Sequence, residues 1–330
     1  MVTVCILIFT VTVLEYGGER IASVDDVGAI RLRNPFPQAP HVKDFVVNPH
    51  PFRYLMNPET LCSGKDVFII TFVLSAPKNL IRRQGIRRTW GNRNRFFSES
   101  FLVVFILGQV ADRKVMTSVK KESGIYGDIV QEDFVDSYRN LTYKSIAGLK
   151  WVSTFCRQAA YVLKTDDDIF VNMKLLLTYI QLTLEPSHGK TDIILGYLMT
   201  HRKVYRSKLA KWYIAKDEYP LEYYKPYCLG LAYLMSSDIA IRMYKLSYTV
   251  PFLWVEDYYI TGLLAQKLSI IHRRYNSAYR LSKVKDVSGQ QYVFYFSPKV
   301  GTLFSLWNDL MIKERRSLQR EHSKSKPIII

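Results

Sequence analysis

Cysteine is scarce in this sequence, which limits the covalent cross-links available to the fold. Four cysteines occur among 330 residues, and no two of them form a C-x-x-C pair. They are too few for a disulfide scaffold. Cys5 lies in an apolar leader, which leaves Cys62, Cys156 and Cys228 downstream. Because three is an odd number, at most one bridge forms among them, and the sequence leaves open which two residues pair.

Several common catalytic signatures are also missing. The histidines never fall at metal-ligand spacing, and no H-E-x-x-H occurs. There is no G-x-S-x-G, no Walker A sequence and no G-x-G-x-x-G. The signatures of the common hydrolases, NTPases and dinucleotide-binding proteins are therefore absent.

Acidic residues are outnumbered. The 29 Asp and Glu stand against 46 Lys and Arg, a formal net charge of +17. Such a charge favours nucleic acid, an anionic membrane surface or a phosphate-bearing substrate as a partner. No recognisable RNA-binding or DNA-binding module is present, so nucleic acid is not expected. Part of the charge lies in a basic tail, residues 313–330, which we interpret as a solvated helix end followed by a frayed terminus.

No apolar run reaches the roughly 20 residues that span a bilayer. The run from Met1 to Leu14 is uncharged but short, and fits a truncated signal-anchor, an uncleaved signal peptide or a buried strand. We favour an N-terminal membrane anchor over residues 1–16. Prolines without a sustained period predict a stem or linker over 17–61, ahead of a catalytic domain at 62–312.

Strands and helices alternate in the first half of that domain. Apolar runs predict strands at Val67 to Leu74, Phe101 to Leu107 and Tyr161 to Leu163, with a third short strand beginning at Ile129. Helices are expected from Asn79 through Trp90 and, at helical spacing, from Ser137 to Phe155. This order predicts an α/β layered domain, whose ligands bind at the carboxyl ends of the strands.

Three aspartates follow the Tyr161 to Leu163 strand directly. In extended backbone Asp166 and Asp168 project to one face, as two hard oxygen ligands suited to Mg²⁺ or Mn²⁺ carrying a diphosphate. The alternative is a solvated acidic turn. The apolar approach to these residues favours the metal interpretation.

A second acidic pair, Glu256 and Asp257, is embedded among aromatic residues. Burial raises the pKa of a carboxyl group, which suits one of the pair to act as a general base. A carboxylate that caps its own helix is an equally good interpretation. Four arginines lie at helical spacing and either face phosphate or form structural salt bridges with the acidic cluster: Arg82, Arg83, Arg87 and Arg88.

Together these segments resemble the β-1,3-galactosyltransferase and β-1,3-N-acetylglucosaminyltransferase family of inverting Golgi hexosyltransferases. The resemblance runs from about Phe68 to Gly262 and rests on several ordered motifs. They are Ser75-Ala76-Pro77, Arg83-Gln84-Gly85-Ile86-Arg87-Arg88-Thr89-Trp90-Gly91, Asp133 through Lys144, Tyr161 through Asn172, Gly196-Tyr197, Lys211-Trp212, Pro226-Tyr227-Cys228 and Glu256-Asp257.

The resemblance implies a GT-A-type α/β fold, a mixed, mostly parallel sheet flanked by helices. It implies a UDP-sugar donor, a Mn²⁺ or Mg²⁺ ion and a glycan acceptor on glycoprotein or glycolipid. It also implies a single-pass type II protein of the Golgi membrane, with the catalytic domain in the lumen. The residues it assigns are Asp257 and Glu256 for catalysis, Arg83, Arg87, Trp90, Lys164, Asp166 and Asp167 for the donor, and Asp168 with Asp166 for the metal.

Two departures from the family pattern stand out. Leu229 and Leu231 replace small residues after Pro-Tyr-Cys, and Phe294 aligns with a histidine that is often a further metal ligand. Two functions therefore remain open. The chain is an active UDP-hexose transferase, which we favour, or a catalytically inactive member of the family that binds glycan or protein.

Overall fold

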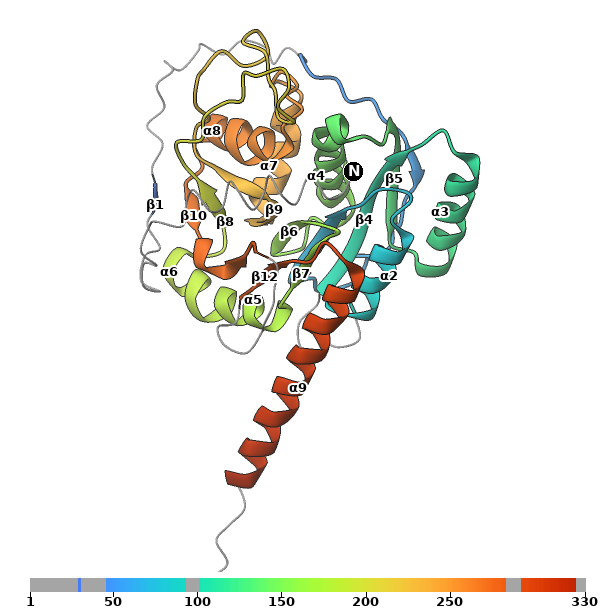
Figure 1. Cartoon of the computed structure of the whole chain (residues 1–330), viewed down its shortest axis with the longest axis vertical. Coiled ribbons are helices and arrows are strands. Elements are labelled where there is room, and N and C mark those ends of the chain that lie inside the picture. The colour runs from blue at the N-terminus through green and yellow to red at the C-terminus, as the bar shows by residue number, and fades with distance from the viewer. Residues whose placement is uncertain (1–28, 31–45, 93–100, 283–291, 325–330) are drawn as a thin grey trace, which may run out of the picture.

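A nine-stranded mixed sheet forms the centre of the computed structural model, which describes residues 29–30, 46–92, 101–282 and 292–324 (Figure 1). The strand order is β1-β10-β8-β9-β6-β3-β4-β5-β2. Strands β3, β4, β5, β6, β8 and β10 run in one direction, and β1, β2 and β9 run in the other. A small second sheet has the order β11-β12-β7. The predicted α/β class, with a mixed, mostly parallel sheet flanked by helices, is confirmed.

The elements have the following bounds. The strands are β1 Ala29–Ile30, β2 Tyr54–Met56, β3 Ile69–Leu74, β4 Phe101–Gln109, β5 Ile129–Val135, β6 Tyr161–Asp166, β7 Ile169–Val171, β8 Ile194–Met199, β9 Tyr227–Ser236, β10 His272–Arg274, β11 Tyr279–Arg280 and β12 Phe294–Phe296. The helices are α2 Leu80–Arg88, α3 Arg113–Tyr126, α4 Leu141–Phe155, α5 Met173–Tyr179, α6 Glu185–His188, α7 Ser237–Ser247, α8 Ala265–Lys267 and α9 Val300–Lys324, with shorter helical segments η1 Tyr138–Asn140, η2 Ile180–Leu184, η3 Tyr258–Leu264 and η4 Asn276–Ala278.

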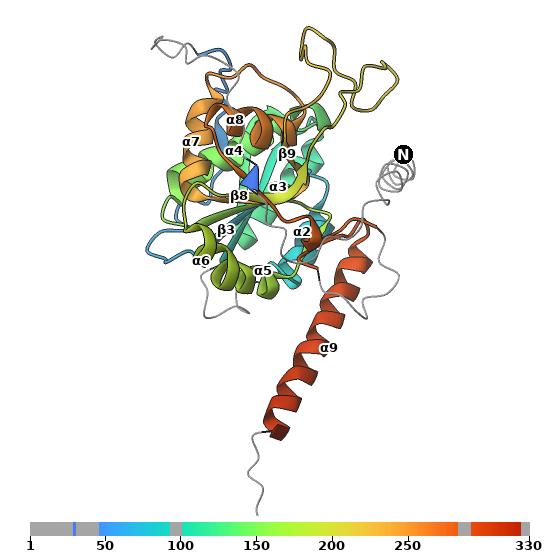
Figure 2. The same ribbon diagram turned by 90° about the vertical axis from the view of Figure 1, so that its left-hand side faces the viewer.

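The central strands are buried on both faces, which explains their unbroken apolar sequence. All six residues of β3 are buried, and β4 is buried along its first eight residues. One face of the sheet packs on α4, α7 and η3, through a core that includes Leu149, Met243 and Tyr259. The other face packs on α2, α5 and the start of α9, through Ile86 and Leu176 among others. Helices therefore cover both faces of the sheet (Figure 2), each over its own hydrophobic core.

The strands and helices expected from the apolar runs are present with shifted ends. Strand β4 continues two residues past the predicted end at Leu107, and the predicted helix from Ser137 divides into η1 and α4. The predicted linker is too long at its carboxyl end. Residues 46–61 belong to the folded body, because β2 pairs with β5 and the Asn48 side chain is buried against Ser247 and Tyr259.

The predicted basic tail is helical over most of its length. Helix α9 begins against the body and then projects away from it (Figure 1), so the expected domain end at 312 falls inside one continuous helix. In the ranges that the structure describes, no helix has the length and apolarity needed to cross a bilayer. The proposed anchor at residues 1–16 lies outside those ranges.

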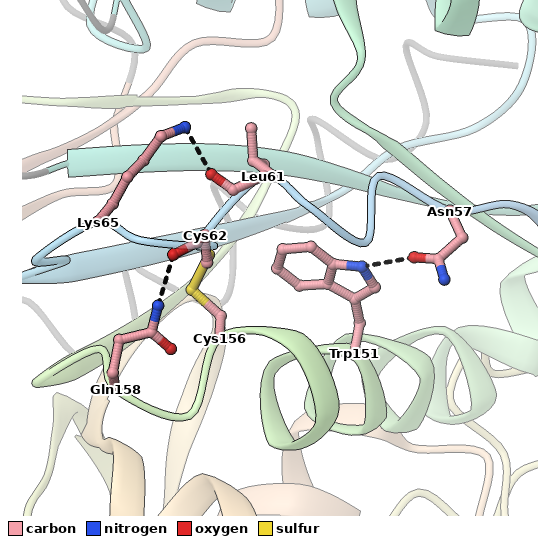
Figure 3. Close-up of a disulfide and its surroundings, with 7 residues drawn as sticks. All are labelled: Asn57, Leu61, Cys62, Lys65, Trp151, Cys156 and Gln158. Atoms are coloured by element: carbon pink, nitrogen blue, oxygen red, sulfur yellow. Dashed lines mark hydrogen bonds between the residues drawn. A yellow bond between two sulfur atoms is a disulfide. The ribbon is translucent and has the colours of Figure 1, made fainter.

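The structure resolves the cysteine pairing that the sequence left open. Cys62 and Cys156 form a disulfide across 94 positions of sequence, and Cys228 is a buried free thiol. The bridge joins the segment ahead of β3 to the end of α4 (Figure 3). Nearby, the Trp151 indole donates to the Asn57 Oδ1 at 2.9 Å, and the Gln158 amide donates to the Cys62 carbonyl at 2.6 Å. The bridge therefore links the segment between β2 and β3 covalently to the carboxyl end of α4.

Removing this bridge with Cys62→Ser and Cys156→Ser together is expected to lower the free energy of unfolding by about 2–5 kcal/mol, since the closed loop is long. Urea unfolding followed by fluorescence measures the change. Reducing agent should bring the wild-type protein to the same stability and leave the double variant unchanged. Equal stability of oxidised wild type and double variant would contradict the prediction.

Candidate active site

Three aspartates lie at the carboxyl end of the central strand β6, next to β3. Asp166 is the last residue of β6 and pairs in register with Leu74, the last residue of β3. Asp167 and Asp168 form the turn into β7. Such an edge is where ligands of open α/β sheets bind. The strand and its acidic end were both predicted, and the structure places them together.

The Asp167 carboxylate is bonded by other side chains of the protein. Its Oδ2 accepts hydrogen bonds from the Ser75 hydroxyl at 2.7 Å and the Asn79 amide at 2.8 Å, and Arg82 lies 3.8 Å from its Oδ1. These contacts fix the loop between β3 and α2 to the aspartate turn. They also explain why Asn79 does not cap α2 with its side chain.

Asp166 and Asp168 are the more available carboxylates. The Oδ1 of Asp168 is buried and has no hydrogen-bond partner among the described residues. Burial, followed by the charges of Asp166 and Asp167, raises the pKa of Asp168 to about 7. Burial also raises the pKa of Asp166 to about 6, although Lys164 opposes the shift. A bound cation would relieve this repulsion and give the orphaned oxygen a partner.

Among the described residues, no group of three or more His, Cys, Asp and Glu side chains is arranged so that it could hold a metal ion. Strand β12 runs beside the aspartate turn, and the Ser297 amide donates to the Asp168 carbonyl at 2.7 Å. Phe294 is buried, 4.6 Å from the Tyr279 ring, and pairs in register with Val171. The strand therefore brings aromatic side chains to the place where the family pattern has histidine.

Lys164 connects the aspartates to the second acidic pair. Its side chain is 1% exposed, and its Nζ lies 2.8 Å from Asp166 Oδ1 and 3.3 Å from Glu256 Oε2. It also donates to the Gly230 carbonyl. Burial disfavours the charged amine, but Asp166 and Glu256 prevail and raise the pKa of Lys164 above its usual value. Lys164 is therefore a permanent cation between the two motifs. Its charge is neutralised by Asp166 and Glu256, which belong to the protein itself.

Glu256 is a buried structural carboxylate. Its Oε1 accepts hydrogen bonds from the Ser145 hydroxyl at 2.5 Å and the Tyr233 hydroxyl at 2.9 Å, and Oε2 faces Lys164. Two hydroxyls and the Lys164 ammonium therefore enclose Glu256, whereas Asp257 has no salt bridge to any residue that the structure describes. Sequence reasoning missed Ser145 and Tyr233, because nothing in a helix pattern or a strand pattern marks one hydroxyl for a distant carboxylate.

Asp257 is held differently. It caps η3, with Oδ1 accepting from the Tyr258 amide at 2.8 Å and Oδ2 accepting from the Gly230 amide at 3.2 Å. Burial, followed by the charge of Glu256, raises its pKa to about 7. The two roles expected of this pair thus coexist in Asp257, a capping carboxylate whose pKa suits proton transfer near neutrality.

Gly230 makes this arrangement possible. A Cβ on Gly230 would lie 3.0 Å from the Asp257 Cβ and 3.3 Å from Glu256 Oε2, closer than side chains normally pack. The neighbouring Leu229 and Leu231 are partly buried, and Leu231 packs against the core beneath β9. Leucines are therefore accommodated on either side of the glycine, while the Gly230 amide keeps its hydrogen bond to Asp257.

The arginines and tryptophan assigned to the donor are engaged elsewhere. Arg83 is fully buried, pairs with Glu122 at 2.6 Å and donates to the Ala76 and Pro77 carbonyls. Arg87 pairs with Glu122 at 2.7 Å and with Asp128 at 2.8 Å. These two residues are the structural salt bridges that the sequence left as an alternative.

Trp90 is likewise not exposed at all, and its ring belongs to the core beneath α2. The two arginines are paired with acidic side chains and the Trp90 ring lies in the core, an arrangement that does not favour the donor contacts expected of these three residues. Arg83 instead holds the Ser75 to Pro77 loop through hydrogen bonds to Ser75, Ala76 and Pro77.

Comparison with known proteins was made by sequence and by structure. The galactosyltransferase family model matches residues 81–276. Beta-1,3-galactosyltransferase 1 of Mus musculus is 38% identical over 276 residues, which cover 81% of this chain and 81% of the relative, and the Homo sapiens protein aligns equally well. Beta-1,3-galactosyltransferase 5 of Mus musculus is 38% identical over 218 residues, 66% of this chain and 69% of the relative.

Solved structures give a weaker likeness. Mouse xyloside xylosyltransferase 1 is 12% identical with a TM-score of 0.34, and covers 71% of this chain and 98% of its own. The galactosyltransferase LgtC is 12% identical with a TM-score of 0.37, and covers 73% and 95%. At these TM-scores the structural likeness adds nothing to the sequence relatives.

Substituting Lys164 tests whether the buried cation holds the two acidic motifs together. Lys164→Met is expected to lower the free energy of unfolding by about 3–5 kcal/mol, because Asp166 and Glu256 lose their buried partner. Lys174→Met is the control, since the Lys174 side chain is 68% exposed and 3.9 Å from Glu314, and it should cost less than about 1 kcal/mol. Equal losses in the two variants, measured by chemical unfolding, would disprove the assigned role.

Proposed function

This chain belongs to the galactosyltransferase family, and we propose that it transfers galactose or N-acetylglucosamine from a UDP-sugar to a glycan hydroxyl, forming a β-1,3 linkage with inversion. Its mixed sheet flanked by helices is the GT-A-type fold expected of that family. The observation that carries the mechanism is the buried Asp257, with a pKa near 7, linked through Gly230 and Lys164 to the aspartates that end β6. The names of the relatives favour galactose as the sugar.

Asp257 acts as the general base in this proposal. It takes the proton from the acceptor hydroxyl while that oxygen forms a bond to the anomeric carbon. The bond from that carbon to the diphosphate breaks on the opposite face, UDP leaves with the electron pair, and the configuration inverts. Glu256 does not touch the substrate here. Through Ser145, Tyr233 and Lys164 it fixes the start of η3, and so positions Asp257.

The expected Mn²⁺ or Mg²⁺ fits the carboxylates at the end of β6. Asp168, with its orphaned Oδ1, and Asp166 are the residues that would hold it. When bound, the ion neutralises charge that develops on the departing diphosphate. Asp167 and Lys164 act on the donor indirectly, since Asp167 anchors the Ser75 loop and Lys164 orients Asp166.

The cellular placement follows the same argument. A long-range disulfide persists in an oxidising compartment, which supports a catalytic domain in the lumen of the secretory pathway. We propose a type II Golgi membrane protein, anchored through its N-terminal segment and acting on glycoprotein or glycolipid.

One observation favours the rival function, a catalytically inactive glycan-binding or protein-binding member of the family. Phe294 contributes an apolar ring where the family pattern has a metal-binding imidazole. A weakly held ion would slow departure of the diphosphate, while UDP-sugar and acceptor still bound. The two variants below separate these functions.

Asp257→Asn is expected to lower kcat by about 10²–10⁴-fold, the usual contribution of a general base, with UDP affinity unchanged. In the wild type, kcat/KM should fall as the pH drops below about 7, because protonated Asp257 cannot accept the hydroxyl proton. UDP release and calorimetry measure the two quantities. Wild-type turnover by Asp257→Asn, or a flat profile between pH 5 and 8, would refute the assignment of the base.

Asp168→Asn should remove the metal-dependent part of UDP binding, at least about tenfold in Kd with Mn²⁺, because a charged oxygen ligand is lost. Without metal, variant and wild type should bind alike. Asp192→Asn is the matched control, since the Asp192 side chain is 65% exposed and pairs only with Arg242 among the described residues. Metal-dependent binding that survives in Asp168→Asn would place the ion elsewhere.

A further inference from the structure

Four aromatic rings form a row that ends at Trp254, three residues before Asp257 in the sequence. Tyr205 and Trp212 come from the segment between β8 and β9, residues 200–226, Tyr138 comes from η1, and Trp254 stands two residues before Glu256. The ring centroids of Tyr205 and Trp212 are 5.6 Å apart, and those of Tyr138 and Trp254 are 6.1 Å apart. The Trp212 indole donates to the Tyr138 hydroxyl at 2.8 Å. We call these four residues the aromatic row.

The β8–β9 segment has a fixed shape although it extends from the body (Figure 2). Arg206 donates to the carbonyls of Ile214, Ala215, Tyr219 and Leu221 at 2.5 to 2.9 Å and so ties the segment to itself. The Tyr219 and Tyr258 hydroxyls lie 2.7 Å apart, which joins the segment to η3, the helix that Asp257 caps. The aromatic row and the base are thus parts of one unit.

Cations accompany the rings of the row. The Arg139 guanidinium lies 3.8 Å from the centroid of Trp254, and the Lys211 ammonium lies 4.5 Å from that of Tyr138. Arg202 donates to the Tyr205 hydroxyl at 2.7 Å. Arg139 and Arg202 form no salt bridge with any residue that the structure describes, in contrast to the paired Arg83 and Arg87. Within the described residues, therefore, no carboxylate neutralises the charges of Arg139 and Arg202 beside the row.

Trp254 adds a polar group without a partner. The residue is 5% exposed, and its buried indole N–H meets no acceptor in the described part of the chain. A buried donor left unsatisfied costs free energy that an arriving acceptor oxygen recovers. The orphaned N–H lies in the residue of the row that is nearest in sequence to Asp257.

We propose that the aromatic row is the acceptor subsite and that it selects acceptor oligosaccharides with a sulfate or carboxylate on a sugar beside the one that is glycosylated. The rings offer flat faces to the apolar sides of the sugars, and Trp254 donates to a hydroxyl. Arg139 at one end of the row and Arg202 at the other attract the anion, since guanidinium groups match the oxygens of sulfate and carboxylate. The inference rests on the proposed transfer reaction only for the identity of the bound sugar as acceptor.

The test measures binding, so that it does not depend on turnover. Acceptor oligosaccharides are prepared in sets of three that differ at one neighbouring sugar, which is neutral, sulfated or a uronic acid. The full chain should bind at least one anionic form about fivefold or more tightly than the neutral form at low salt, and the preference should shrink at high salt because exposed charges are screened. The form that binds more tightly identifies the anion.

Variants then assign the preference to the row. Arg139→Gln and Arg202→Gln should each bring the ratio of affinities toward one, and Arg139→Lys should retain part of it. Arg113→Gln, at an exposed position of α3, should keep the wild-type ratio. Thermal unfolding confirms that each variant is folded.

The outcomes separate this inference from the proposed reaction. A ratio of one for both anions, or a preference that survives Arg139→Gln and Arg202→Gln together, overturns the inference even when transfer is observed. A preference for the anionic acceptor that is lost in these variants supports the inference even when no acceptor is turned over. The absence of turnover would then contradict only the proposed reaction.

Discussion

A buried lysine holds the functional edge of this protein together. Lys164 lies inside the central strand β6, with Asp166 on one side and Glu256 on the other, and donates to the Gly230 carbonyl as well. Three acidic residues of the site would otherwise repel one another in a poorly solvated space, where unit charges interact far more strongly than in water. The cation converts that repulsion into a cross-link between β6, β9 and η3. The placement of Asp257 depends on this cross-link, because Gly230 and Glu256 both belong to it.

The four acidic side chains at this edge of the sheet differ in how fully other protein groups bond them. Asp167 and Glu256 accept hydrogen bonds from side chains and lie beside Arg82 and Lys164, whereas Asp168 keeps an oxygen without a partner among the described residues, and Asp257 accepts from two backbone amides and has a raised pKa. The first two carboxylates stabilise the site, and the last two are the ones to which the proposed function assigns chemistry. The arginines differ in the same way. Arg83 and Arg87 are each paired with Glu122, whereas Arg139 and Arg202 lie beside the aromatic row without a carboxylate partner among the described residues.

Much of the fold could be predicted from sequence, because a strand buried on both faces must be apolar throughout, as β3 and β4 are. The two acidic motifs could also be found, since carboxylates directly after an apolar strand or among aromatics are unusual. The different roles of the carboxylates within each motif could not be predicted. Glu256 is bonded by hydroxyls of Ser145 and Tyr233, which are distant in sequence, and no local pattern distinguishes it from Asp257. The same holds for Trp90, because a motif shows that a residue matters without showing whether it contacts ligand or core.

The backbone of Gly230 also affects which neighbouring residues can change during evolution. Its amide is bonded to Asp257 and its carbonyl to Lys164, so a single peptide segment transmits the position of one motif to the other through backbone atoms. Backbone atoms are the same whatever the neighbouring side chains are. Substitutions at positions 229 and 231 can therefore change the side chains beside the two acidic motifs while the backbone link between the motifs is retained, so that relatives of this chain could differ there and keep the same arrangement of carboxylates.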